Sequence, residues 1–171
     1  MNIETLIKDK AIKPKEKTET ISRWLLEDAL SIDELVDYAI KSKDPVKATC
    51  IEAIEFATKQ HPSIANEKVL VFVTNMLAEK APRVKWESAK VIGNIAGQFA
   101  GQLDTCISGL LSNTEHEGTV VRWSAAYALG EILKLRTKHN AELLPAIEAI
   151  CAREEKKSIC KIYLSAIKAL K

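Results

Sequence analysis

Glycine, proline and aromatic residues are scarce in this chain of 171 residues, which contains 6 glycines, 5 prolines and only 5% aromatic residues. Sheet proteins need many turn residues and favour aromatic and β-branched side chains, so this scarcity argues against a sheet. Alanine, isoleucine, leucine, lysine and glutamate are abundant instead, and most of them favour helices. The hydrophobic share of 47% and the charged share of 28% are typical of one globular domain with a real core.

Several signals of location and metal binding are also missing. No apolar run reaches the roughly 18 residues that a transmembrane helix needs. The N-terminus lacks the basic and then apolar layout of a secretion signal, so we expect a cytoplasmic protein with no membrane contact. The four cysteines, Cys50, Cys106, Cys151 and Cys160, form no Cys-x-x-Cys pair, and we expect buried thiols. Without a cluster of cysteines or histidines, no metal or other cofactor is expected.

Catalysis has little support in the sequence. The three histidines, His61, His116 and His139, fall at helix ends or in loops, and no serine or cysteine has a partner that would activate it. No glycine-rich phosphate-binding loop is present. The net charge of +2 does not indicate a polycation that would seek nucleic acid on charge alone. We therefore expect no catalytic residues.

An internal repeat is the strongest signal in the chain. Residues 84–95, VKWESAKVIGNI, recur 37 residues further on as residues 121–132, VRWSAAYALGEI. Valine, tryptophan, alanine, glycine and isoleucine are identical between the two copies. Weaker copies begin at Val46 and Ile159, each at an offset of 38 residues. A period in this range indicates supersecondary units that stack side by side.

The hydrophobic spacing predicts helices between these repeats. Expected helices cover approximately residues 16–30, 63–80, 81–99, 102–111, 119–138, 141–153 and 159–170. Ser31 followed by Glu34 is typical of a capping box that opens a helix, and Asp44 before Pro45 is expected to cap the next one. Pro145 is tolerated in the helix expected at 141–153 only if that helix truly begins near residue 144.

Each period contains two helices. The second helix opens with Asp-Pro-Val-Lys, Ala-Pro-Arg-Val-Lys or Thr-Val-Val-Arg and closes with Ala-Leu-Gly-Glu-Ile. In these features the chain resembles the HEAT repeat family, which is armadillo-like. The resemblance implies an all-α fold, a right-handed α-α superhelix (solenoid) of about four HEAT-like helix pairs. It implies one domain over residues 1–171, with an N-terminal capping segment at 1–30 and repeats at 31–62, 63–100, 102–138 and 140–171. The last repeat departs from the pattern, because Lys168 replaces the glycine and Cys160 the basic residue.

In HEAT-type stacks the second helices line the concave side, and the repeated helix has a second face suited to that position. On a wheel of about 100° per residue, Trp86 and Lys90 lie opposite the apolar stripe that contains Val84. The equivalent residues of the next repeat are Trp123 and Tyr127. Exposed aromatic residues that cluster are typical of protein interfaces, although each tryptophan could also pack between repeats. The expected partner-binding residues are Trp86, Lys90, Trp123, Tyr127, Glu52, Glu87, Asn94 and Glu131, with Lys134 beside them.

A basic residue follows the first valine of three of the repeats, at Lys47, Lys85 and Arg122. The resemblance implies that these residues form a basic ladder with acidic residues of the adjacent turn, for which Asp44 is the candidate. A second interpretation is a basic ridge that touches phosphates, since HEAT-like stacks occur among DNA alkylation-repair glycosylases that bind damaged duplex.

The sequence therefore predicts a non-enzymatic scaffold that binds a protein or peptide partner through its concave face. The alternative is a nucleic-acid-binding stack related to those glycosylases. We expect a monomer or a weak homodimer, in which the same face docks onto a second copy.

Overall fold

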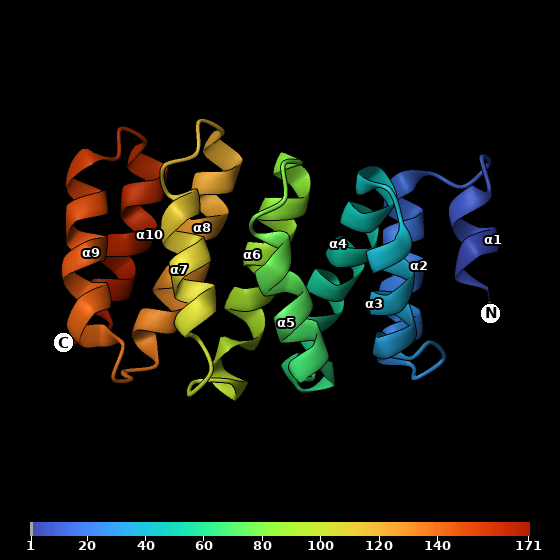
Figure 1. Ribbon diagram of the computed structural model, residues 1–171, viewed down its shortest axis with the longest axis horizontal. Helices are drawn as coiled ribbons and strands as arrows, with labels where there is room; N and C mark the ends of the chain where they lie inside the picture. Colours follow the sequence, from blue (N-terminus) through green and yellow to red (C-terminus); the bar gives the residue numbers. More distant parts are fainter. Residues whose placement is uncertain (1) are drawn as a thin grey trace.

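The computed structural model describes residues 2–171, and this part of the chain consists of helices joined by short turns, with no strand (Figure 1). The helices are, in order, α1 (Ile3–Lys8), α2 (Pro14–Leu26), α3 (Ile32–Lys41), α4 (Asp44–Gln60), η1 (Pro62–Ile64), α5 (Glu67–Met76), α6 (Pro82–Ile95), η2 (Ala96–Gln98), α7 (Asp104–Asn113), α8 (Thr119–Lys134), α9 (Asn140–Arg153) and α10 (Lys157–Lys168). The prediction of an all-α fold is confirmed.

The helices form two rows that run from one end of the molecule to the other (Figure 1). We call α2, α4, α6, α8 and α10 the inner row, and α3, α5, α7 and α9 the outer row. Consecutive helices of the inner row pack closely along their lengths, whereas consecutive helices of the outer row touch much less. Because each helix packs mainly on its neighbours in this order, the chain is a helical solenoid.

Local sequence explains where many of these helices begin. Prolines stand in the first turn of α2, α4 and α6, where the missing amide hydrogen costs nothing. Ser31 caps α3 as predicted, because its hydroxyl accepts a hydrogen bond from the Asp33 amide at 3.3 Å. Asn66 caps α5 in the same way through the Val69 amide, at 3.1 Å. Turns rather than long loops therefore separate the helices.

Some predicted helix ends were wrong. Asp44 does not cap α4, since Lys43 occupies the cap position and Asp44 lies in the first turn. The helix expected over residues 63–80 is split into the short η1 and α5, with the Asn66 cap between them. Pro145 lies inside α9, which begins at Asn140 rather than near residue 144. Proline removes one amide donor there, and the surrounding helix persists.

The apolar stripe expected from the repeat is buried. Val84, Val91, Ile92 and Ile95 of α6 have no exposed surface, and neither has Leu129 of α8. The same helices bury alanines and serines beside these residues, which lets neighbouring helices of the inner row approach closely. The core therefore runs as one continuous layer between the two rows.

The cysteines divide into two kinds. Cys50 and Cys106 are buried as expected, and burial raises the pKa of the Cys50 thiol to about 12. Cys151 and Cys160 are only half-buried, which corrects the expectation that all four are buried. Each of their sulfurs lies against the carbonyl oxygen of the other, at 3.8 Å and 3.4 Å, across the turn between α9 and α10. Within residues 2–171, no helix is both long and apolar enough to cross a membrane.

Candidate functional site

Two aromatic side chains stack on the inner row. Trp123 and Tyr127 are one helical turn apart on α8, and their ring centroids lie 6.1 Å apart with an interplanar angle of 13°. Trp123 is 40% exposed and Tyr127 is half-buried. Trp86, the equivalent residue on α6, is also half-buried. The repeated tryptophan position thus carries an open aromatic surface on α8 and a more enclosed one on α6.

The position of Tyr127 is fixed from α6. Its hydroxyl donates a hydrogen bond of 2.7 Å to Asn94 Oδ1. The Asn94 amide in turn donates to the Glu55 carbonyl at 3.1 Å and to Thr58 Oγ1 at 3.2 Å, both on α4. The ring itself lies over Gly93, where a Cβ atom would come within 2.5 Å of Tyr127 Cε1. Gly93 is therefore required for the close approach of α8 to α6.

A buried ionic group lies beside Trp86. Lys90 Nζ donates to Glu87 Oε2 at 3.0 Å and lies 3.9 Å from Glu55 Oε2. The Glu87 side chain is only 4% exposed and that of Glu55 only 6%, whereas Lys90 is 24% exposed. Trp86 Nε1 donates to the other Glu87 oxygen at 2.9 Å. The expectation that Glu87 flanks a surface patch was wrong, because its carboxylate is sealed under Trp86 and Lys90.

A second polar link joins three helices of the inner row. Glu52 on α4 accepts a hydrogen bond from Thr18 on α2 at 2.9 Å. The same Glu52 oxygen pairs with Arg83 on α6 at 2.8 Å. On α8, Glu131 pairs with Lys134 at the surface. Glu52 and Glu131 are thus on the inner row where the sequence placed them, each with its charge paired.

Burial and nearby charges shift the pKa values of two groups on this face, Glu87 and Tyr127. Burial raises the pKa of Glu87, although Lys90 and the Trp86 indole both act to lower it. Burial, followed by the nearby Glu131 and Glu55 carboxylates, raises the pKa of Tyr127 to about 12. The phenol therefore keeps its proton at neutral pH and serves as the hydrogen-bond donor to Asn94.

The basic residues of the repeat form ion pairs and hydrogen bonds with other groups of the same chain. Lys47 lies 3.8 Å from Asp44, the acidic partner expected for it, and its side chain is 12% exposed. Within the part of the chain that the structure describes, Lys85 has no acidic partner, and it donates to the Leu77 carbonyl at 2.9 Å and to Asn113 Oδ1 at 3.3 Å. The basic residues of the ladder therefore do not all pair with acidic residues, because a backbone carbonyl and a side-chain amide oxygen take the place of the carboxylate at Lys85.

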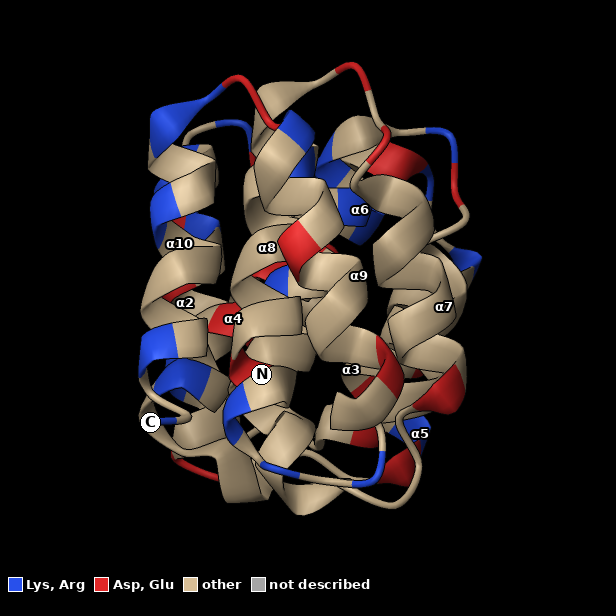
Figure 2. Cartoon of the chain, turned by 90° about the vertical axis from the view of Figure 1, so that its left-hand side faces the viewer, with Lys and Arg blue, Asp and Glu red and all other residues tan. Residues whose placement is uncertain are grey.

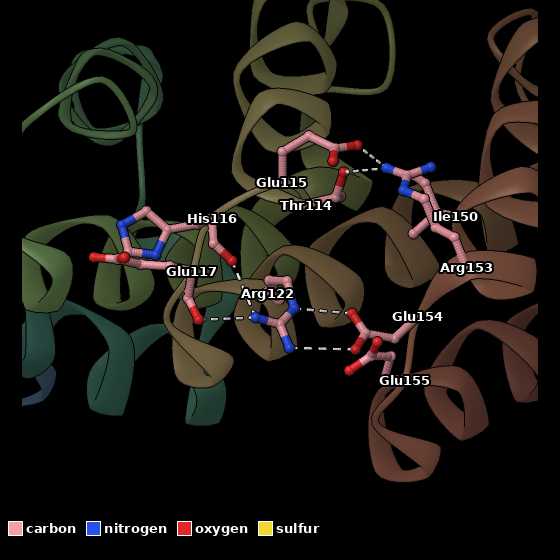
Figure 3. Close-up of a pocket in the computed structure, with 9 residues that line it drawn as sticks. All are labelled: Thr114, Glu115, His116, Glu117, Arg122, Ile150, Arg153, Glu154 and Glu155. Atoms are coloured by element: carbon pink, nitrogen blue, oxygen red, sulfur yellow. Dashed lines mark hydrogen bonds and ion pairs between the residues drawn. The ribbon is translucent and has the colours of Figure 1, made fainter.

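Arg122 makes the most extensive contacts of the three (Figure 3). Its guanidinium pairs with both oxygens of Glu154, at 3.0 Å and 3.3 Å. It also donates to the carbonyls of His116 and Glu117, each at 3.0 Å. These groups line a polar cleft of about 340 Å³ between the turn before α8 and the end of α9. Since its charge is already compensated here, Arg122 holds the two turns together.

Three residues of this face were missed by the sequence reasoning, namely Thr18, Glu55 and Arg83. Glu55 carried the clearest signal, because it lies three residues after Glu52 and so shares its side of α4. Arg83 stands directly before Val84, the first valine of the repeat, and could have been interpreted as a surface charge. Only the packing of α2, α4 and α6 brings Thr18 and Arg83 to Glu52, and Lys90 to Glu55.

Replacing Gly93 with alanine tests the contact with Tyr127. Alanine favours a helix by about 1 kcal/mol over glycine, yet we expect Gly93→Ala to lower the free energy of unfolding by about 1–3 kcal/mol, because the new methyl displaces the Tyr127 ring. Urea denaturation measures the change. Gly97→Ala is the control, since its Cβ would lie 3.7 Å from Leu135, and we expect no loss there. A Gly93→Ala protein at least as stable as the wild type would contradict the contact.

Comparisons with known proteins agree on the fold. No family model and no curated protein matches the sequence. Among solved structures, a designed armadillo repeat protein in complex with the peptide (KR)4 superposes with a TM-score of 0.76 at 17% identity, over 99% of this chain and 80% of the designed one. A second designed armadillo repeat protein gives a TM-score of 0.72 at 17% identity, over 99% and 81%. An engineered protein gives 0.75 at 17% identity, over 99% and 79%. The fold of this chain is therefore that of an armadillo-like helical repeat solenoid, as the repeated sequence predicted.

Proposed function

We propose that this protein is a non-enzymatic scaffold that binds an extended peptide segment along its inner row, with Trp123, Tyr127 and Trp86 as the anchors. The observation that carries the proposal is the open aromatic pair on α8, held in place by Asn94 beside the carboxylates of Glu55 and Glu131. Aromatic side chains of this kind are typical anchors of protein interfaces. They lose little conformational freedom on binding because the surrounding contacts already fix them.

The close packing of the inner row supports a concave shape on that side. A stack whose helices approach more closely in one row than in the other curves towards the closer row. An extended chain that lies along this row would meet the anchors of successive repeats in turn. The solved structure of a designed armadillo repeat protein with a bound peptide supports this class of partner, at the level of the shared fold.

A cationic side chain of the peptide fits the aromatic pair best. Lysine and arginine are attracted to the faces of tryptophan and tyrosine rings within about 6 Å. The carboxylates of Glu131 and Glu55 beside Tyr127 add to that attraction, and Lys134 and Lys90 offset part of their charge.

Nucleic-acid binding is the weaker candidate. It rested on Lys47, Lys85 and Arg122, and each of these cations already contacts a carboxylate, an amide or a carbonyl of the protein. Binding phosphates would require these contacts to break. We therefore favour a peptide over a nucleic acid.

Affinity measurements on one substitution test the proposal. Peptides selected from a random library on the wild-type protein, with (KR)4 as a defined probe, are labelled and titrated against Trp123→Ala. We expect the affinity to fall at least about tenfold, the size typical of an aromatic anchor. Backbone NMR shifts caused by the peptide should map to α4, α6 and α8.

Val71→Ala is the matched control, because Val71 is 53% exposed on α5 in the outer row. It should leave the affinity unchanged. Circular dichroism confirms that both variants keep their helices. The proposal is rejected if Trp123→Ala binds the peptides as well as the wild type does, or if the shifts map to the outer row.

A further inference from the structure

The charge of the inner row changes along its length. In its central part, among residues 2–171, the carboxylates of Glu52, Glu55 and Glu87 form ion pairs with two cations, Arg83 and Lys90. This part has a small excess of negative charge next to the aromatic anchors. A peptide that lies here gains from a positive residue.

The terminal helix α10 has the opposite character. Residues 157–171 contain four lysines and no aspartate or glutamate. At about 100° per residue, Lys157, Lys161 and Lys168 lie within about 40° of one another on the helix, and all three are exposed. Among residues 2–171, none of the three forms an ion pair with an acidic side chain. Figure 2, seen from the end of the stack, shows blue segments along α10.

A cleft of about 400 Å³ joins these two regions between α8 and α10. Its lining comprises two hydroxyls, two ammonium groups, one phenol and one carboxylate over a floor of small and apolar residues: Ser158, Ser165, Lys134, Lys161, Tyr127, Glu131, Gly130, Ile162 and Ala166. Glu131 already pairs with Lys134, so Lys161 supplies the uncompensated charge. The hydroxyls offer donors to an anion, and the apolar floor accepts the methylenes of a side chain.

We propose that the partner is a peptide of mixed charge, whose cationic residue stacks on Trp123 and Tyr127 and whose aspartate or glutamate enters the α8–α10 cleft and pairs with Lys161. This inference rests on the function proposed above and adds the chemistry of the partner. Tyr127 borders both regions, so the two peptide residues bind close together. Neighbouring helices lie about 8–10 Å apart and an extended chain advances about 3.3 Å per residue, which places the acidic residue about three positions from the cationic one.

Three labelled peptides of equal length test this inference. The first carries a Lys-Arg pair followed three positions later by a Glu-Glu pair, the second carries the same residues in scrambled order, and the third is (KR)4. We expect the first peptide to bind at least about tenfold more tightly than the other two at low salt, with an advantage that shrinks as salt rises. Lys161→Glu should abolish that advantage and leave (KR)4 bound as tightly as before, or more tightly.

Lys41→Glu is the control, since Lys41 is an exposed lysine at the end of α3 in the outer row, and it should change none of the affinities. The inference is overturned, while the proposed function stands, if (KR)4 binds as tightly as the mixed peptide or if Lys161→Glu weakens both equally. If none of the three peptides binds, or if Trp123→Ala leaves their affinities unchanged, the proposed function and the inference are both rejected.

Two other occupants of the cleft would also overturn the inference. A (dT)12 oligonucleotide that binds more tightly than the mixed peptide, with a steep salt dependence, would show that the lysines serve a nucleic acid. A molecular mass that doubles with concentration in light scattering, and that the mixed peptide does not reduce, would show that a second copy of the chain fills the cleft.

Discussion

Replacing Lys90 with methionine is expected to lower the free energy of unfolding by roughly 3 kcal/mol near neutral pH. Methionine keeps the packing of the lysine stem but removes the cation that contacts both Glu55 and Glu87. Two nearly buried carboxylates are then left without the cation that neutralises them. We take the lower end of the usual range for a broken buried ion pair because Lys90 is itself 24% exposed. Urea denaturation at neutral pH measures the loss.

The pH dependence gives this prediction a distinctive signature. Burial raises the pKa of Glu87 above its ordinary value of 4.5, so the folded protein holds this proton more tightly than the unfolded chain does. Glu87 therefore stabilises the fold most below pH 4.5, and that contribution is lost as the pH rises through the raised pKa. Removing Lys90 raises the pKa further, because Lys90 acts to lower it. The stability deficit of Lys90→Met should accordingly be large at pH 7 and shrink towards pH 4.

Lys134→Met provides the matched comparison. Lys134 pairs with Glu131, but the two side chains are 41% and 35% exposed, and surface pairs contribute at most about 1 kcal/mol. We expect this variant to stay close to the wild type at every pH. If Lys90→Met showed the same small deficit as Lys134→Met, or a deficit that did not depend on pH, the buried ionic group would have no role in stability.

The fold could be predicted because its signal repeats within the chain. The twelve residues from Val84 recur from Val121, and the apolar stripe of each copy is buried at the same helical positions. The face that bears Trp123 and Tyr127 could also be placed, since it is set by helical geometry within a single segment. The repeat boundaries proposed from the sequence stay predictions.

The burial of Glu87 could not be predicted in this way. On the wheel of α6 it lies between Trp86 and the core, a position whose exposure depends on what covers it. The covering groups are Glu55 from α4, together with Lys90 and the indole of Trp86. A wheel describes one helix and contains no information on its neighbour. The same reason explains why the link between Glu52 and Arg83 was missed.

Replacing Leu129 with alanine is expected to cost about 2–5 kcal/mol of stability, the range found for truncating a fully buried leucine. Leu129 has no exposed surface, and it lies on α8, the helix that packs against both α6 and α10 in the inner row. In a solenoid each unit is stabilised mainly by its neighbours, so a defect here weakens the connection between α9–α10 and the rest of the chain. We therefore expect a lower urea midpoint together with a broader transition.

Hydrogen exchange distinguishes a loss of stability concentrated in α9 and α10 from a loss shared equally by all helices. The amides of α9 and α10 should lose more protection than those of α2 to α4, which do not contact α8 closely. Leu164→Ala is the control, because Leu164 is 56% exposed on α10 and its truncation removes little buried surface. A Leu129→Ala protein with a loss below about 1 kcal/mol would mean that the site collapses around the missing methyl groups. Equal loss of protection in every helix would instead mean that the whole chain unfolds as one cooperative unit, so that coupling between neighbouring repeats exceeds the stability of each repeat.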